Sequence, residues 1–156
     1  MRISRKKAMV KCLVIILALC IALVMGLHFG AEQNTKKKMA AALGEIENMF
    51  SAINTKLTIY DLSKTENLQM IEENYIEAFA GLSFTGKLIN ISWRGDRLSF
   101  LFREILQSGN ISEEQKDYFI DFNNTCINAI KQSKGSYSKE GYGFIYRIID
   151  EYQWPD

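Results

Sequence analysis

The sequence is poor in histidine, cysteine and proline, and each scarcity excludes a class of protein. Its 156 residues include one His, three Cys and one Pro. The lone His28 cannot form a His-rich zinc site, and it leaves the later part of the chain without the base of a Ser-His-Asp or Cys-His arrangement. Three Cys exclude a small disulfide-stapled domain. One Pro and ten Gly exclude collagen-like and Pro-rich chains.

The remaining chemistry-bearing residues do not form a recognisable reactive set. Glu73 and Glu77 lie one helical turn apart, but no His stands nearby, so an exposed charged face is expected. The 18 acidic residues would allow a carboxylate pair of the glycosidase kind, but nothing in the sequence selects one. Cys126 is expected to be a small buried hydrophobe. We therefore predict no catalytic residue, no metal ligand and no cofactor, and a chain that is not an enzyme.

The near-neutral total charge conceals an uneven distribution along the chain. Residues 1–11 hold five of the 19 basic residues and none of the 18 acids, and residues 12–31 hold no formal charge. The remainder therefore has 14 basic and 18 acidic residues, a net charge of −4. A mildly acidic domain is not expected to bind nucleic acid. The basic N-terminus is better explained by a membrane.

The uncharged segment 12–31 is long enough to cross a bilayer. Twenty residues at helical rise cover about 30 Å, the thickness of a hydrocarbon core. In lipid the backbone must satisfy its own hydrogen bonds, so this segment is predicted to be an α-helix that inserts into the lipid bilayer.

Three fates of this helix compete, and an uncleaved signal anchor is favoured. A cleaved signal peptide would need small residues at positions −3 and −1 of its cleavage site, and the sequence near Ala31 does not provide them. A lipoprotein signal at Cys20 has the bulky Leu19 where a small residue is needed. The five basic residues before the helix place the N-terminus in the cytoplasm and the rest of the chain outside the cell membrane, although Lys36, Lys37 and Lys38 weaken this bias. The residue composition is typical of AT-rich bacteria.

Beyond the anchor, apolar residues recur at the spacing of helices. The first series follows the alternating steps of four and three that mark a heptad seam, and consists of Met39, Leu43, Ile46, Phe50, Ile53, Leu57 and Tyr60. It suits either a coiled-coil dimer or one face of an intramolecular bundle. A second series consists of Leu68, Ile71, Tyr75, Phe79 and Leu82. Ser63 and Glu66 match a capping box at its start.

Three further helices are expected. Gly81 and Gly86 are expected to loosen the chain before a third apolar series, Phe84, Leu88, Ile91, Gly95, Leu98, Phe102 and Ile105. Gly109 is expected to end this helix. A capping box of Ser112 and Gln115 is expected to begin the next helix. The apolar face of that helix consists of Phe119, Phe122, Cys126, Ala129 and Ile130. Residues 136–143 are expected to be a turn-rich loop before a short last helix over residues 144–152.

The predicted fold is all-α, with a single N-terminal transmembrane helix followed by a small antiparallel helical bundle of about four or five helices. Its expected parts are a basic cytoplasmic tail (1–11), a transmembrane signal anchor (12–31), a juxtamembrane stem helix (32–62) and an extracytoplasmic bundle (63–156) packed with the stem.

Trp93, Arg94 and Arg97 form the candidate partner-binding patch. They surround Gly95, and Trp and Arg are the side chains most enriched in binding hot spots. The favoured function is a non-catalytic protein-interaction, assembly or accessory factor, which binds a membrane or extracytoplasmic protein and can form a homodimer through the stem. The alternative is an extracytoplasmic ligand-sensing bundle that works with a partner subunit.

Overall fold

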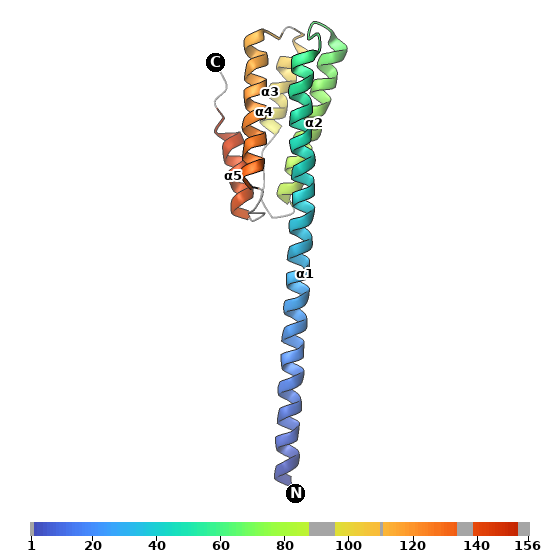
Figure 1. The fold of residues 1–156 in the computed structure, drawn as a ribbon, viewed down its shortest axis with the longest axis vertical. Helices are drawn as coiled ribbons and strands as arrows, with labels where there is room; N and C mark the ends of the chain where they lie inside the picture. The colour runs from blue at the N-terminus through green and yellow to red at the C-terminus, as the bar shows by residue number, and fades with distance from the viewer. Residues whose placement is uncertain (1, 88–95, 110, 134–138, 153–156) are drawn as a thin grey trace. The chain divides into compact units, whose positions relative to one another are not determined.

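The computed structural model describes residues 2–87, 96–109, 111–133 and 139–152 (Figure 1). Within these ranges the chain is all-helical and forms five helices, and no strand occurs there. They are α1 (Arg2–Ile59), α2 (Thr65–Lys87), α3 (Asp96–Gln107), α4 (Glu113–Ser133) and α5 (Lys139–Asp150). The chain divides into two compact units, Met1–Lys37 and Lys38–Asp156, and the second unit is called the body below.

In the N-terminal unit, α1 has exposed side chains throughout residues 15–34. From Ile15 to Phe29 its large apolar residues are 53–68% exposed. Just after them, the Nζ atom of Lys36 lies 2.7 Å from a carboxylate oxygen of Glu32. The unit therefore has a long apolar surface that no described part of the protein covers.

The heptad seam of α1 faces the body's own core, as the intramolecular interpretation predicts. Its residues from Met39 to Leu57 are at most 2% exposed, and only Tyr60, at the end of the helix, is partly exposed. The seam is therefore occupied within one chain, and an intermolecular coiled coil through the same residues is not needed to bury it.

Aromatic side chains fill the centre of this core. The ring of Phe50 lies 6.5 Å from that of Tyr75, 6.2 Å from that of Phe79 and 6.3 Å from that of Phe122, measured between centroids, and all three contacts are edge-on. Phe102 brings α3 into the same cluster, with its centroid 4.3 Å from that of Tyr75. Such pairs each contribute about 0.5–1.5 kcal/mol beyond the burial of their area.

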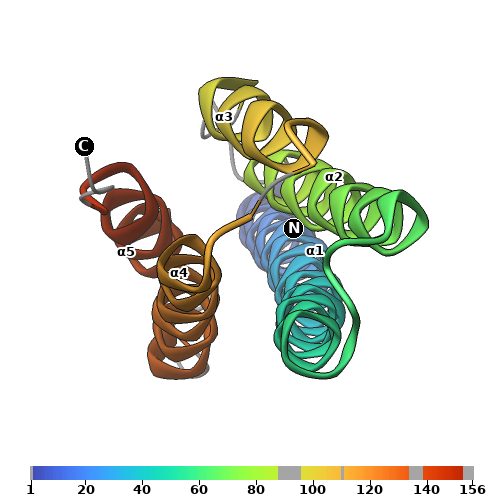
Figure 2. The same ribbon diagram turned by 90° about the horizontal axis from the view of Figure 1, so that it is seen from above.

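Helices α2 and α3 lie side by side, and so do α4 and α5 (Figure 2). The predicted series of α2, from Leu68 to Leu82, and the predicted face of α4 are all buried. Gly109 ends the α3 segment with φ = +69°, a left-handed conformation that Gly adopts at little cost.

Two expectations about the segment around Leu82 are wrong. Gly81 and Gly86 do not loosen the chain, because both lie inside α2. Phe84 does not start a third buried series, since it belongs to α2 and is 61% exposed. Phe102 is buried as predicted, whereas Leu88, Ile91 and Gly95 lie outside the described residues.

The expected loop over residues 136–143 is also wrong in its second half. Helix α5 already begins at Lys139, and Tyr142 is only 1% exposed. Burial of Tyr142 beside Ile145 and Tyr146 on one helical face outweighs the weak helix propensity of the two neighbouring Gly residues.

Gly81 permits a close approach between α1 and α2. A Cβ atom added at Gly81 would lie 3.1 Å from Cγ1 of Ile46, whereas one added at Gly44 would meet no atom within 4 Å. We expect Gly44→Ala to raise the free energy of unfolding by about 1 kcal/mol, because Ala is the better helix former. Gly81→Ala should raise the free energy of unfolding by less, or lower it, because its Cβ would crowd Ile46. Urea unfolding of the two variants measures this difference. An equal rise in the free energy of unfolding of both variants would contradict the close approach of α1 and α2 at Gly81.

Candidate functional site

The exposed apolar part of α1 is the most prominent surface feature of the described chain. Among the described residues, one helix is long and apolar enough to cross a membrane, and none of its apolar window is buried. His28 lies in this segment and is exposed, as are Cys20 and Phe29. At helical rise this segment is long enough to match the thickness of a bilayer's hydrocarbon core.

The patch predicted from Trp93, Arg94 and Arg97 falls largely outside the described residues. Trp93 and Arg94, with Gly95 between Arg94 and α3, are not described. Arg97 is the second residue of α3, but its side chain is not described. Whether these three side chains come together therefore stays a prediction.

A surface hollow of about 340 Å³ lies where the α1–α2 and α3–α4 connections meet. It is lined by Tyr60, Asp61, Leu62, Ser63, Gly109, Ile111, Glu113 and Lys116. The hollow is open to solvent and mainly polar.

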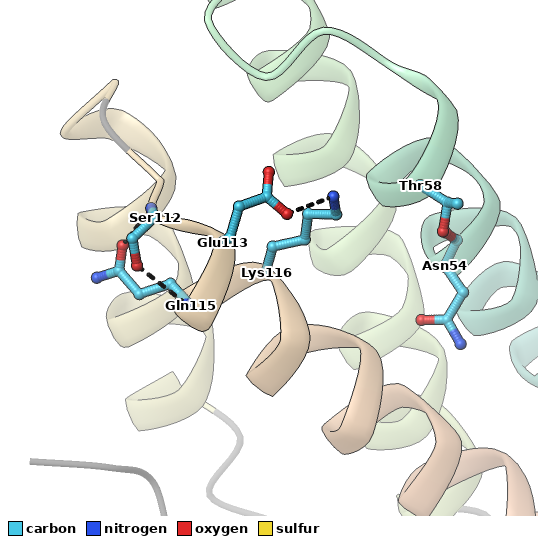
Figure 3. A network of polar contacts seen from close by, with 6 residues as sticks. All are labelled: Asn54, Thr58, Ser112, Glu113, Gln115 and Lys116. Atoms are coloured by element: carbon cyan, nitrogen blue, oxygen red, sulfur yellow. Dashed lines mark hydrogen bonds and ion pairs between the residues drawn. The ribbon is translucent and has the colours of Figure 1, made fainter.

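The start of α4 borders the hollow and is capped as the sequence predicts (Figure 3). The amide of Gln115 donates to the Ser112 hydroxyl at 3.1 Å, and the amide of Ser112 donates to the Gln115 side-chain oxygen at 3.0 Å. Beside this cap, Lys116 Nζ lies 2.8 Å from a carboxylate oxygen of Glu113. The reciprocal hydrogen bonds of Ser112 and Gln115 satisfy two free amides at the helix start and fix one rim of the hollow.

The capping box predicted from Ser63 and Glu66 does not form. The hydroxyl and the amide of Ser63 instead donate to Oδ1 of Asp61, at 2.6 and 3.1 Å. These two hydrogen bonds hold the pKa of the Asp61 carboxyl below its usual value. Helix α2 begins two residues after Ser63, at Thr65, so Ser63 belongs to the connecting turn.

A chain of polar side chains crosses the core between α2, α4 and α1. The Tyr75 hydroxyl donates to Oδ1 of Asn123 at 2.9 Å, and Nδ2 of Asn123 donates to Oδ1 of Asn54 at 2.8 Å. Nδ2 of Asn54 in turn donates to Oδ1 of Asn124 at 2.9 Å. Tyr75 and Asn123 are at most 1% exposed, and burial raises the pKa of the Tyr75 hydroxyl. The network fixes the register of α4 against α1, because a shift would leave buried polar atoms unpaired.

Sequence reasoning missed this network, although a signal for it exists. Asn123 stands four residues after Phe119, which places a polar side chain on the buried stripe of α4. A polar residue on such a stripe needs partners from a neighbouring helix.

Cys126 is the one cysteine of the body. Cys126 is fully buried, as predicted, and burial raises the pKa of its thiol far above the usual value. It is therefore protonated at neutral pH and inert as a nucleophile. Among the described residues, no group of three or more His, Cys, Asp or Glu could hold a metal ion.

Comparison with other proteins gave no match: no protein-family model fits the sequence, and no curated protein or solved structure is significantly similar to it. The function proposed below is inferred from the chemistry of this chain.

Proposed function

We propose that the protein is a single-pass membrane protein whose helical body acts outside the cytoplasmic membrane as a non-catalytic interaction, assembly or accessory factor. In this proposal residues 1–11 are a cytoplasmic tail, 12–31 an uncleaved signal anchor, 32–62 a stem helix and 63–156 an antiparallel bundle packed with the stem.

The observation that carries the proposal is the exposed apolar stretch of α1. Its large side chains between Ile15 and Phe29 are 53–68% exposed. In water this would be a large unfavourable apolar surface, whereas in lipid it is matched to the hydrocarbon core. The five basic residues within residues 1–11 favour a cytoplasmic N-terminus.

The interaction role is supported by the state of two side chains among the described residues. Cys126 is buried and protonated, and Lys116, on the rim of the polar hollow, is ion-paired with Glu113. The ligand-sensing alternative stays a prediction. The polar hollow bordered by Lys116 is where a small ligand would be sought. A homodimer through the stem would need the exposed side of residues 32–62, since the seam from Met39 to Leu57 is buried.

Crosslinking in intact membranes tests the interaction role. The tagged full chain is crosslinked, purified and analysed by mass spectrometry. We expect a specific protein partner that is lost when Trp93, Arg94 and Arg97 are all replaced by Ala. A matched triple-Ala variant at the exposed Lys64, Gln69 and Met70 should keep it. Recovery of only the uncrosslinked monomer under efficient crosslinking would contradict the proposal.

A further inference from the structure

One end of the body is formed where α1 enters it and where α2 finishes. Lys38 is the first residue of the body, and within the body α1 and α2 run in opposite directions. A Cβ atom added at Gly81 would lie 3.1 Å from Cγ1 of Ile46, so these two positions are level with each other. From there α1 is eight residues, or about 12 Å, from Lys38, and α2 is six residues, or about 9 Å, from Lys87. Both lysines therefore lie at the same end of the body, which is called the Lys38 end below.

Helices α3, α4 and α5 also have one terminus toward the Lys38 end (Figure 1). In the last turn of α4, Lys131 Nζ lies 3.8 Å from a carboxylate oxygen of Glu47 on α1. The Tyr146 hydroxyl on α5 donates to the carbonyl oxygen of Leu82 at 2.6 Å, near the end of α2. Helix α3 ends beside the first half of α2, so its first turn lies toward the Lys38 end.

The two ends of the body differ in net charge. At the Lys38 end, the four-residue helix turns and the ion-pair partner of Lys131 have a net charge of +2, from Lys38, Lys87, Arg97, Lys131 and Lys139 against Glu47, Asp96 and Glu140. The helix turns toward the other end have a net charge of −2, from Lys56, Lys116 and Arg147 against Glu66, Glu104, Glu113, Glu114 and Asp150. Lys38 and Lys87 are exposed, and neither forms an ion pair with another described residue.

The chain enters the body close to the end of the apolar segment. Seven residues lead from Ala31 to Lys38, and they lie within α1, so they cover about 10 Å. The head groups of one leaflet occupy about 5–8 Å beyond the hydrocarbon core. If residues 12–31 span the bilayer, Lys38 therefore lies within about one Debye length, about 8 Å at physiological ionic strength, of the head groups.

We propose that the Lys38 end of the body docks on the anionic phospholipid head groups of the bilayer that holds α1, with Lys38 and Lys87 on lipid phosphates. This inference rests on the proposed function and adds to it the partner of one surface. A negatively charged bilayer attracts the Lys38 end and repels the acidic opposite end, so it selects this orientation of the body.

Weak contacts are sufficient for this docking, because the anchor already holds the body at the bilayer. The contact between the body and the lipid is intramolecular in effect, so its effective concentration is high. Each lysine near an anionic bilayer favours the docked state about fivefold. The docking also gives a role to Lys38, a basic residue on the side of the anchor where the charge bias of membrane proteins does not favour one.

Lysine labelling of the full chain in lipid vesicles tests the docking. Vesicles of phosphatidylcholine are compared with vesicles of equal parts phosphatidylcholine and anionic phosphatidylglycerol. A neutral amine-reactive ester is added, and the labelling rate of each lysine is measured by peptide mass spectrometry. An ammonium group held on a phosphate stays protonated and reacts slowly. We expect Lys38 and Lys87 to react about fivefold more slowly in the anionic vesicles, and the exposed Lys64 at the opposite end to react at an unchanged rate.

A charge reversal shows whether the two lysines dock together. Lys38→Glu should reduce the slowing at Lys87 to less than about twofold, because the docked state loses one attraction and gains one repulsion. Lys64→Glu makes the same change of charge at the opposite end and should leave the slowing at Lys87 intact. Full slowing at Lys87 in the Lys38→Glu variant would overturn the proposal.

Flotation of the chain with both kinds of vesicle tests the anchor separately. If the chain floats with both and Lys87 reacts at the same rate in both, the docking is wrong and the anchor stands. If the chain floats with neither, the anchor and the docking are both wrong.

Discussion

Replacement of Phe50 with Asp is expected to abolish the cooperative unfolding of the body. Phe50 is fully buried, and its ring contacts Tyr75, Phe79 and Phe122. Truncation of a buried Phe costs about 3–5 kcal/mol, and an unpaired carboxylate in the same place costs more. The combined loss approaches the whole free energy of unfolding of a typical domain, about 5–15 kcal/mol. Thermal melting of the full chain, followed by circular dichroism, should lose its sharp transition.

Ile59→Asp is the matched control for this prediction. Ile59 lies on the same helix but is 68% exposed, so the new carboxylate stays in water and the melting temperature should change little. Unchanged melting in the Phe50→Asp variant would mean that the seam from Met39 to Leu57 does not face the core.

The second large effect is expected from two charges in the apolar segment. Replacing both Leu19 and Leu23 with Lys should move the chain from the membrane pellet to the soluble fraction. Each Lys near the centre of a spanning helix costs about 2.5–3.5 kcal/mol for insertion, so the two together cost about 5–7 kcal/mol. Both side chains are about two-thirds exposed, at 65% and 66%, so the substitutions remove no packing within the protein.

Replacing the same two residues with Ile gives the control, because the segment stays apolar. That variant should remain in the pellet after alkaline extraction, like the original chain. If the double-Lys variant is retained in the pellet as well as the double-Ile variant, residues 12–31 are not the anchor.

The part of the fold that could be predicted is the part in which burial repeats along one segment. The steps of three and four from Met39 to Leu57 leave only one helical face that can be buried, and that face is buried. The cap at Ser112 and Gln115 was predictable for a similar reason, since both bonds form between residues three apart.

The errors arose where a competing contact decides a local structure. Ser63 and Glu66 have the spacing of a cap, but Asp61 competes for the Ser63 hydroxyl and the helix starts later. Tyr142 stands between two Gly residues, yet the core that α5 joins provides more stabilisation than a loop would. The partners of Asn123 come from α1 and α2, far away in the sequence, so local spacing shows that Asn123 needs partners but not which residues they are.

The central claim is that α1 anchors the chain with its body on the outer side of the membrane, and thiol labelling in intact bacterial cells tests it most directly. Ser4→Cys and the exposed Ser51→Cys are made separately in a chain whose Cys12 and Cys20 are Ala, and each is treated with a membrane-impermeant maleimide. The account predicts a membrane-bound protein that is labelled at residue 51 in intact cells, and at residue 4 only after permeabilisation. Labelling at residue 4 but not at residue 51, protection of both, or a mature chain that starts after Ala31 would contradict it.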